Sequence, residues 1–147
     1  LNTLIEESEK TLNTLMRQRF LSLNIYEKCK YYIEILSDIN LKSVHNICHG
    51  DLSNRNIMKY KDKLFLLDWE DAFLAIPEYD LCYWMTFIDQ RRFYNRGLFD
   101  FLDIGKVTAL SIMIVVTILK CGISYKDKSY KNNSISFNSR IEEILSL

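Results

Sequence analysis

Glycine and proline are scarce in this chain, which has four glycines and one proline among 147 residues. So few turn-forming residues exclude collagen-like sequence and low-complexity linkers, and they disfavour folds built from many tight turns. Histidine is also scarce, with two residues, and the four cysteines form no C-x-x-C pair. A zinc site is therefore not expected.

Net charge is absent as well, because nineteen Lys and Arg balance nineteen Asp and Glu. A neutral chain lacks the broad basic surface that nucleic acids bind, so we expect no nucleic-acid partner. The most apolar stretch covers 107–119. Thirteen helical residues span about 20 Å, whereas a bilayer core is about 30 Å thick, so we interpret the stretch as a buried helix and expect no membrane partner.

The first residues contain no basic segment followed by an apolar block, and they predict no secretory signal. Most of the cysteines have apolar neighbours, which indicates buried free thiols and a reducing compartment. We therefore expect a cytoplasmic protein. The four thiols belong to Cys29, Cys48, Cys82 and Cys121.

Apolar residues make up 48% of the chain and charged residues 26%, as in ordinary globular domains. A chain of this length buries about two-thirds of its unfolded surface, which is enough for one core. We expect a single domain over 1–147, of the α+β class and mainly helical.

Helical and strand periods follow one another in a simple order. The pattern predicts two amphipathic helices, a structured loop, a β-hairpin, and further helices with a polar surface loop before the last. The expected helices cover 3–21, 24–38, 79–93, 106–120 and 139–145, the strands 57–60 and 64–67 around a turn at 61–63, and the surface loop 126–139. Two helices thus occupy 1–42, the loop and hairpin 43–70, and a helical region 78–147.

Acidic and amide side chains gather on the non-helical segment. Asp51 follows His49-Gly50, Asn56 lies five residues later, and Asp68 ends the second strand of the hairpin. A tight hairpin brings the Asn56 end beside the Asp68 end, with Asp51 on the loop entering it. Oxygen ligands of this kind suit Mg²⁺, which usually takes one or two carboxylates plus phosphates and water. Alternatively, the same side chains only satisfy loop amides and end a strand.

Three ordered motifs in this region carry a family resemblance: His49-Gly50-Asp51-Leu52-x-x-x-Asn56, Leu67-Asp68-Trp69-Glu70 and Pro77-x-x-Asp80-Leu81. Together they resemble the aminoglycoside phosphotransferase and choline kinase superfamily, whose enzymes share the protein-kinase-like fold. The Asp51-to-Asn56 interval equals that of the protein-kinase catalytic loop. The resemblance implies the C-terminal lobe of an ATP-dependent phosphotransferase that acts on an alcohol group, with a small β-hairpin carrying the catalytic and metal residues.

The resemblance also implies a role for each matching residue. Asp51 would accept the proton of the attacking hydroxyl, while Asn56 and Asp68 would hold Mg²⁺ on the nucleotide phosphates. His49 would be a packed side chain that holds the loop. Asp80 would brace the same loop and open a helix, where a carboxylate suits the helix dipole.

Further residues support weaker expectations about the substrate. Glu70 and Asp71 could attract a cationic substrate, although a solvated acidic surface is equally compatible with their pattern. Four aromatic residues could form a box for a quaternary ammonium, but aromatics at helical spacing more often belong to the core. These residues are Trp69, Tyr83, Trp84 and Phe87.

The motifs match one lobe of a kinase. Only 48 residues precede His49, their pattern is helical, and they include no Gly-rich strand-loop-strand element and no strand lysine. We therefore expect the N-terminal nucleotide-clamping lobe to be absent and the chain to be a part of a longer enzyme, inactive alone. A lobe without its partner exposes apolar area, which predicts self-association through the inter-lobe surface.

Three functions remain open at this level. The first is the lobe of a small-molecule kinase with Mg²⁺ as cofactor, ATP as co-substrate and a small hydroxyl compound as acceptor. A choline-like alcohol is slightly preferred to an aminoglycoside-like one, because the neutral charge gives little support to a strongly acidic pocket. The second is a degenerate lobe acting as a non-catalytic binding or regulatory module. The third is an unrelated helical protein with a chance match.

Overall fold

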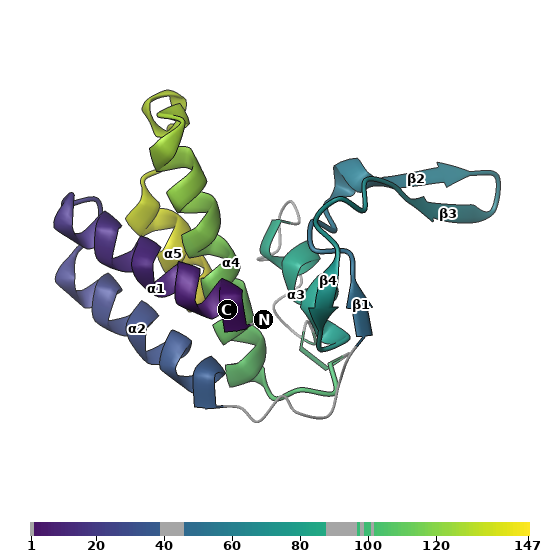
Figure 1. Cartoon of the computed structure of the whole chain (residues 1–147), viewed down its shortest axis with the longest axis horizontal. Helices are drawn as coiled ribbons and strands as arrows, with labels where there is room; N and C mark the ends of the chain where they lie inside the picture. The colour runs from purple at the N-terminus through teal and green to yellow at the C-terminus, as the bar shows by residue number, and fades with distance from the viewer. Residues whose placement is uncertain (1, 39–45, 88–96, 98, 101) are drawn as a thin grey trace.

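The architecture is mainly helical α+β with two small antiparallel sheets, as the sequence predicts. Figure 1 shows the long helices gathered on one side and the strands with one short helix on the other. The candidate site lies where these two parts meet. The computed structural model describes residues 2–38, 46–87, 97, 99–100 and 102–147.

The central element is α4 (Lys106–Lys126), a helix of 21 residues. Four helices pack against it: α1 (Asn2–Arg17), α2 (Leu23–Asp38), α3 (Glu78–Phe87) and α5 (Phe137–Leu145). A run of Ile, Val, Leu and Met makes α4 apolar on all sides, so it requires cover on several sides. The expected buried helix over 107–119 is confirmed, since Ile112, Met113 and Ile114 are fully buried.

Length and composition alone would allow α4 to cross a membrane. In this fold, however, 67% of its most apolar stretch is buried by the protein itself. Burial of this extent is what a central helix of a packed core has.

The strands form two separate pairs. β1 (Asn46–Cys48) pairs with β4 (Phe73–Ala75), and β2 (Ile57–Tyr60) pairs with β3 (Lys63–Leu66), both antiparallel. Tyr60 lies opposite Lys63, so the β2–β3 hairpin turns over the two residues Lys61 and Asp62. This hairpin extends away from the helices in Figure 1. The predicted hairpin is confirmed, although its second strand covers 63–66 rather than 64–67 and its turn is one residue shorter than predicted.

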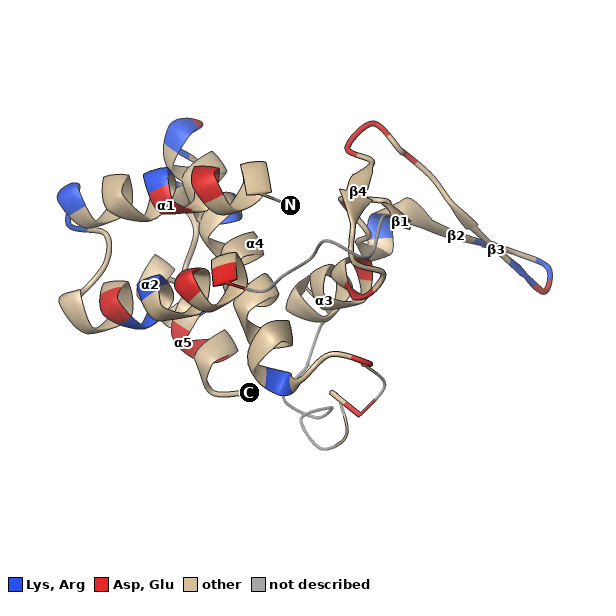
Figure 2. Ribbon diagram, turned by 60° about the horizontal axis from the view of Figure 1, so that its bottom comes forward, with Lys and Arg blue, Asp and Glu red and all other residues tan. Residues whose placement is uncertain are grey.

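Charged side chains of both signs are interspersed over the helices. Figure 2 shows Lys or Arg together with Asp or Glu on each of α1 and α2. Each of these two helices has three acidic and two basic residues, so both signs of charge lie on the same helix.

Helix ends differ from the predicted ones. α1 ends at Arg17 rather than at 21, and α4 continues six residues past the predicted end at 120. The predicted helix over 79–93 is described as far as Phe87, and 88–93 lie outside the described residues. Such shifts arise because packing, rather than local preference, decides where a helix stops.

The polar stretch 126–139 is not a plain surface loop, and this prediction was wrong. It contains a 3₁₀ turn, η3 (Ser129–Asn132), and α5 begins within it, capped by the Ser136 side chain, which accepts a hydrogen bond from the Ser139 amide. Two aromatic residues anchor the stretch: the rings of Tyr130 and Phe137 lie 4.9 and 5.5 Å from the ring of Phe20. The abundance of Asn and Ser in this stretch predicted a loop, so the packing of these two aromatic residues was not expected.

The β1–β4 pair was not predicted. Each strand has three residues, too few to show an alternation of apolar and polar side chains. The strands pair from Asn46 opposite Ala75 to Cys48 opposite Phe73, and more than twenty residues of sequence separate them. The β1–β4 pair matters for function because the loop that carries Asp51 starts at the end of β1.

The expected buried thiols are confirmed, since all four cysteines are free and buried.

Candidate active site around Asp51

The loop that carries Asp51 begins where β1 ends, at Cys48. Gly50 has a φ of +86°, a conformation that L side chains rarely adopt. The backbone of Asp71 lies so close to Gly50 that a Cβ at this position would collide with the Asp71 carbonyl. Only glycine therefore lets the loop turn here against the segment that follows β3.

Asp80, in the first turn of α3, holds the start of this loop. Its Oδ2 accepts a hydrogen bond from the His49 amide at 2.7 Å, and its Oδ1 accepts one from the Gly50 amide at 3.1 Å. A carboxylate that accepts two backbone N–H groups fixes the loop relative to the helix. These contacts are the ones that the expected bracing role requires.

His49 is fully buried and joins the loop to the hairpin. Its Nδ1 lies 3.3 Å from the Asp51 amide, and its Nε2 lies 2.7 Å from the carbonyl oxygen of Leu67. The neutral tautomer with hydrogen on Nε2 satisfies both contacts, because Nδ1 then accepts and Nε2 donates. The Trp69 ring packs on the imidazole at 4.8 Å between centroids. His49 thus has the position of a packing residue, without access to act as a base.

The Asp51 carboxylate is the meeting point of three elements. Oδ1 accepts a hydrogen bond from the Tyr83 hydroxyl on α3 and lies 3.5 Å from Lys120 Nζ on α4. Oδ2 accepts a hydrogen bond from Asn56 Nδ2 at 3.1 Å, and the same amide group donates to the Asp51 carbonyl at 2.8 Å. The side chain of Asp51 is 31% exposed. It is therefore held on several sides and still reaches solvent.

These contacts keep Asp51 ionised. Partial burial by itself would raise the pKa of the carboxyl, but the hydrogen bond from Tyr83, the charge of Lys120 and the bond from Asn56 outweigh it and lower the pKa below its usual range. Conversely, burial and the bond to Asp51 raise the pKa of Tyr83, so its phenol stays protonated and donates. The ionised carboxylate of Asp51 thus accepts a charge-assisted hydrogen bond from the neutral phenol of Tyr83.

Asn56 and Asp68 lie at the same end of the hairpin. The Leu67 amide donates to the Asn56 carbonyl at 2.9 Å, which continues the β2–β3 pairing and places Asp68 next to that position. Both hydrogen bonds from the Asn56 side chain to Asp51 come from Nδ2, so neither of these contacts uses the amide oxygen Oδ1. Asp68 has a φ of +64° and is exposed.

These two side chains fit a magnesium ion by their chemistry. An amide oxygen and a carboxylate are hard donors, and a magnesium ion that also binds phosphates takes one or two protein ligands. Among the described residues there is no group of three or more His, Cys, Asp or Glu that could hold a metal ion. The pair Asn56 and Asp68 would therefore need phosphate oxygens and water to complete a coordination shell.

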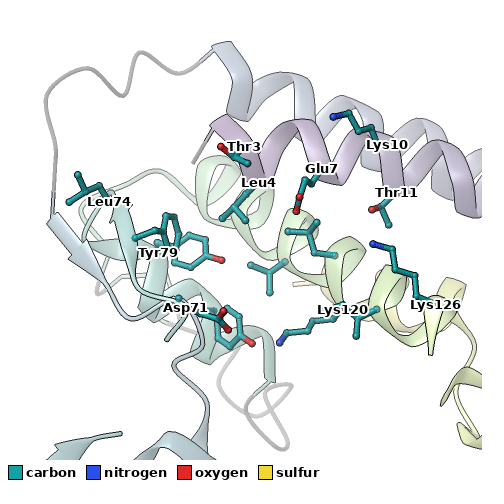
Figure 3. Close-up of a pocket in the computed structure, with 17 residues that line it drawn as sticks. Thr3, Leu4, Glu7, Lys10, Thr11, Asp71, Leu74, Tyr79, Lys120 and Lys126 are labelled. Carbon is teal, nitrogen blue, oxygen red and sulfur yellow. The ribbon is translucent and has the colours of Figure 1, made fainter. Parts of the chain in front are cut away.

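A pocket of about 840 Å³ lies next to this loop: Gly50 lines it, whereas Asp51, Asn56 and Asp68 do not. Its floor is α4, one wall is α1, and the other wall is the segment around β4 and the start of α3 (Figure 3). Tyr83 and Lys120, which both contact Asp51, also line this pocket. Asp71 lies on the lining, whereas Glu70 does not.

The four aromatic residues of the expected box make different contacts. The Tyr83 and Phe87 rings lie 5.0 Å apart, but Trp69 packs on His49 and the Trp84 indole donates to Asn54 Oδ1 at 2.9 Å. The structure therefore does not bring the four together as one cage.

Sequence reasoning missed Lys120 and gave Tyr83 a different role. A signal existed for the lysine, since it is the one charged residue within α4 between its two terminal lysines. A charge in an otherwise apolar helix marks a position where the helix reaches a polar partner or solvent, and the Lys120 side chain, 42% exposed, does both. The sequence did not indicate which partner, and the structure identifies it as Asp51.

Comparison with known proteins gives one match. The sequence model of the phosphotransferase enzyme family matches residues 27–107, more than half of the chain, and this range contains Asp51, Asn56, Asp68 and Asp80. No curated protein and no solved structure matches the chain.

Proposed function

Because the chain belongs to the phosphotransferase enzyme family, we propose that it takes part in transferring the γ-phosphoryl group of ATP to a hydroxyl group of a small molecule. The family match confirms the resemblance read from the three motifs, and it supports a phosphotransferase at the level of the family. The acceptor alcohol and the use of ATP with Mg²⁺ are parts of our proposal.

One observation carries the proposal: the Asp51 carboxylate joins the candidate metal ligands to the pocket. One of its oxygens contacts Asn56, and the other contacts Tyr83 and Lys120, which line the pocket. Phosphoryl transfer needs such an arrangement, because the acceptor and the phosphates must be held in line while charge develops on the phosphoryl oxygens. An acceptor hydroxyl at this end of the pocket would lie next to Tyr83 and Lys120, the two lining residues that contact Asp51.

Each residue of the site has a separate role in this proposal. Asp51 would orient the acceptor hydroxyl and take its proton as the new P–O bond forms and the bond between the γ-phosphorus and the β–γ bridging oxygen breaks, which releases ADP; this task suits a carboxylate that stays ionised. Asn56 and Asp68 would hold Mg²⁺, which neutralises negative charge on the nucleotide phosphates. Asp80 and His49 keep the loop in place through the hydrogen bonds described above. Lys120 lies close enough to Asp51 to compensate its charge.

We further propose that this chain has the arrangement of the C-terminal lobe of a protein-kinase-like fold. Its support is the order of motifs on one loop, one hairpin and the first turn of α3. No glycine precedes Gly50 in the sequence, and the described residues ahead of His49 include no lysine on a strand, so we expect turnover only when a nucleotide-clamping lobe is supplied. The non-catalytic alternative would predict loss of the motif carboxylates and amide, and Asp51, Asn56 and Asp68 are all present.

The test is a phosphoryl-transfer assay with Mg²⁺, ATP and a panel of small alcohols, on the chain alone and on the chain joined to the segment encoded upstream of it. We expect transfer in the joined form, and a fall in kcat of about 10²-fold or more in Asp51→Asn. Asp62→Asn, at the exposed tip of the hairpin, is the matched control and should retain full activity.

Asp68→Asn tests the metal assignment separately. It should raise the Mg²⁺ concentration needed for half-maximal rate, because one charged ligand is removed. An unchanged rate in Asp51→Asn would exclude Asp51 as the group that serves the acceptor. A complete absence of transfer in the joined form would instead support the non-catalytic module.

A further inference from the structure

The Lys120 ammonium belongs both to an ion pair with Asp51 and to the lining of the pocket. Its Nζ lies 3.5 Å from Asp51 Oδ1 and 5.4 Å from the centre of the Tyr83 ring, and the Tyr83 hydroxyl donates to the same carboxylate oxygen. Lys120 and Tyr83 line the pocket, whereas Asp51 does not. An acceptor hydroxyl that reaches Asp51 from the pocket therefore also meets the Lys120 ammonium.

The position of this ammonium is set by the core of the protein. Lys120 follows the fully buried Ile118 on α4 and precedes the buried Cys121. Figure 3 shows the Lys120 side chain leaving α4 toward the side of the pocket where Asp71 lies. Among the described residues, Lys120 is the one lysine or arginine within ion-pair distance of Asp51. A helix held by packing thus supplies the cation next to the proposed catalytic carboxylate.

The ion pair between Lys120 and Asp51 is open enough to be exchanged for another. Its 3.5 Å separation is longer than a charge-assisted hydrogen bond of about 2.8 Å, and the two side chains are 42% and 31% exposed. An exposed ion pair of this kind contributes little to stability. Loss of the charge on Asp51 would therefore free the ammonium for a different anion at small cost.

Phosphoryl transfer removes that charge. As the bond from the acceptor oxygen to the γ-phosphorus forms and the bond to the β–γ bridging oxygen breaks, the hydroxyl proton passes to Asp51 and ADP leaves. The carboxylate becomes a neutral acid, and the anionic phosphoryl group is now bonded to the oxygen beside it. The two other acids on the pocket lining, Glu7 and Asp71, are exposed, so water and salt screen their charges.

From these observations we infer that Lys120 is a catalytic residue whose ammonium passes from Asp51 to the transferred phosphoryl group. This inference rests on the proposed function for the placement of the acceptor hydroxyl and the phosphates. Before transfer, the ammonium compensates the charge of Asp51. During transfer, it offsets the negative charge on the phosphoryl oxygens, as a fixed cation does in reactions of this type.

The Asp51→Asn variant of the 147-residue chain tests the inference without turnover, because its neutral amide imitates protonated Asp51. The probe is propyl phosphate, and its affinity is measured by ³¹P NMR titration. We expect Asp51→Asn to bind propyl phosphate about fivefold to tenfold more tightly than the unaltered chain, because Lys120 then lacks its carboxylate partner. Propan-1-ol, measured by ligand-observed NMR, should show no such gain.

A second substitution in the Asp51→Asn chain assigns the gain to one lysine. Lys120→Met should abolish most of it, because the ammonium that binds the phosphate is removed. Lys126→Met is the matched control: it removes an equal charge from the same helix and the same pocket lining, six residues further along, and should keep the gain. No gain in Asp51→Asn, a gain that survives Lys120→Met, or equal losses in the two double variants would each overturn the inference.

Kinetics of the active, joined form separate a direct role from a positioning role. Lys120→Met should lower kcat about 10²-fold with little change in the KM of the acceptor, because the contact forms only as the phosphoryl group arrives. Lys120→Arg keeps the charge and should bring kcat to within about tenfold of the original. The loss in Lys120→Met should persist when the pH is raised. A rate that recovers at higher pH would mean that Lys120 only keeps Asp51 ionised, and it would overturn the direct role.

Failure of the proposed function gives a different result. If Asp51→Asn binds propyl phosphate through Lys120 but no form of the protein transfers phosphate from ATP, the phosphoryl transfer is excluded, and Lys120 is a phosphate-binding residue without a catalytic role. If the joined form transfers phosphate at the full rate in Lys120→Met, the transfer stands and the role of Lys120 is excluded.

Discussion

Gly50 occupies a position where a side chain has no room. Its φ of +86° and the Asp71 carbonyl against its Cα both require glycine. Gly50→Ala should therefore destabilise the fold by about 2 kcal/mol, as a combination of backbone strain and a clash with main chain. Chemical denaturation measures this loss.

Gly105→Ala is the matched control, because no atom lies within 4 Å of a Cβ there and its φ is −62°. It should cost less than about 1 kcal/mol, the size of a changed helix cap. Equal losses in both variants would show that the approach of Asp71 to Gly50 does not constrain the loop.

The Tyr83 hydroxyl donates a hydrogen bond to Asp51 and so orients the carboxylate of the proposed catalytic residue. Tyr83→Phe removes the hydrogen bond to Asp51 Oδ1 and leaves the ring contacts in place. We expect kcat of the active form to fall roughly tenfold with little change in KM, because a carboxylate that loses a strong donor is less well oriented. Tyr26→Phe removes a hydroxyl bonded to Asn13 on the surface and should keep the full rate. A Tyr83→Phe enzyme with unchanged kcat would contradict the positioning role.

Among the elements, the β2–β3 hairpin could be predicted from local sequence, whereas the beginning of α5 could not. The hairpin follows from two short apolar runs around a Lys-Asp turn, and its register brings Asn56 beside the segment of Asp68. The beginning of α5 was placed two residues too late because Ser136, which caps it, stands among other serines and asparagines. A cap is recognisable only when its helix is already known.

The cap of α5 gives a prediction for this element. Ser136→Ala should destabilise the protein by about 1 kcal/mol, because the Ser139 amide loses its acceptor at the helix start. Thermal or urea unfolding measures the effect. Ser134→Ala, at an exposed residue two positions earlier, should change the free energy of unfolding by no more than about 0.5 kcal/mol. A Ser136→Ala variant as stable as the control would mean that α5 is held by packing alone.

At the scale of the whole molecule, the core makes the cysteines unreactive. Burial raises the pKa of Cys29, Cys82 and Cys121 to about 12 and that of Cys48 to about 11. A raised pKa keeps a thiol protonated, so at pH 8 all four lack the reactive thiolate. A thiol reagent should label almost none of them in the folded chain and all four after unfolding in guanidinium. Rapid labelling of any cysteine in the folded chain would show that the core opens there.

The strands expose a large apolar surface. Ile47 is 71% exposed and Leu64 69%, and among the described residues each sheet has only two strands. We therefore expect concentration-dependent self-association of the chain, measured by light scattering or sedimentation. Leu64→Gln should weaken it, whereas Leu23→Gln, at a residue 62% exposed on α2, should not. A monomer at all concentrations would contradict this prediction.

The sequence by itself determined the local features: the amphipathic helices, the hairpin, and the order of Asp51, Asn56, Asp68 and Asp80. These are readable because helix and strand periods and motif spacings depend on residues close together in the chain. The tertiary structure alone decided that Tyr83 and Lys120, 32 and 69 residues from Asp51, contact its carboxylate, and that residues of α1 and α4 line one pocket. The physical reason is that packing around the buried helix α4 sets these contacts, and no local pattern records which faces of distant helices will meet.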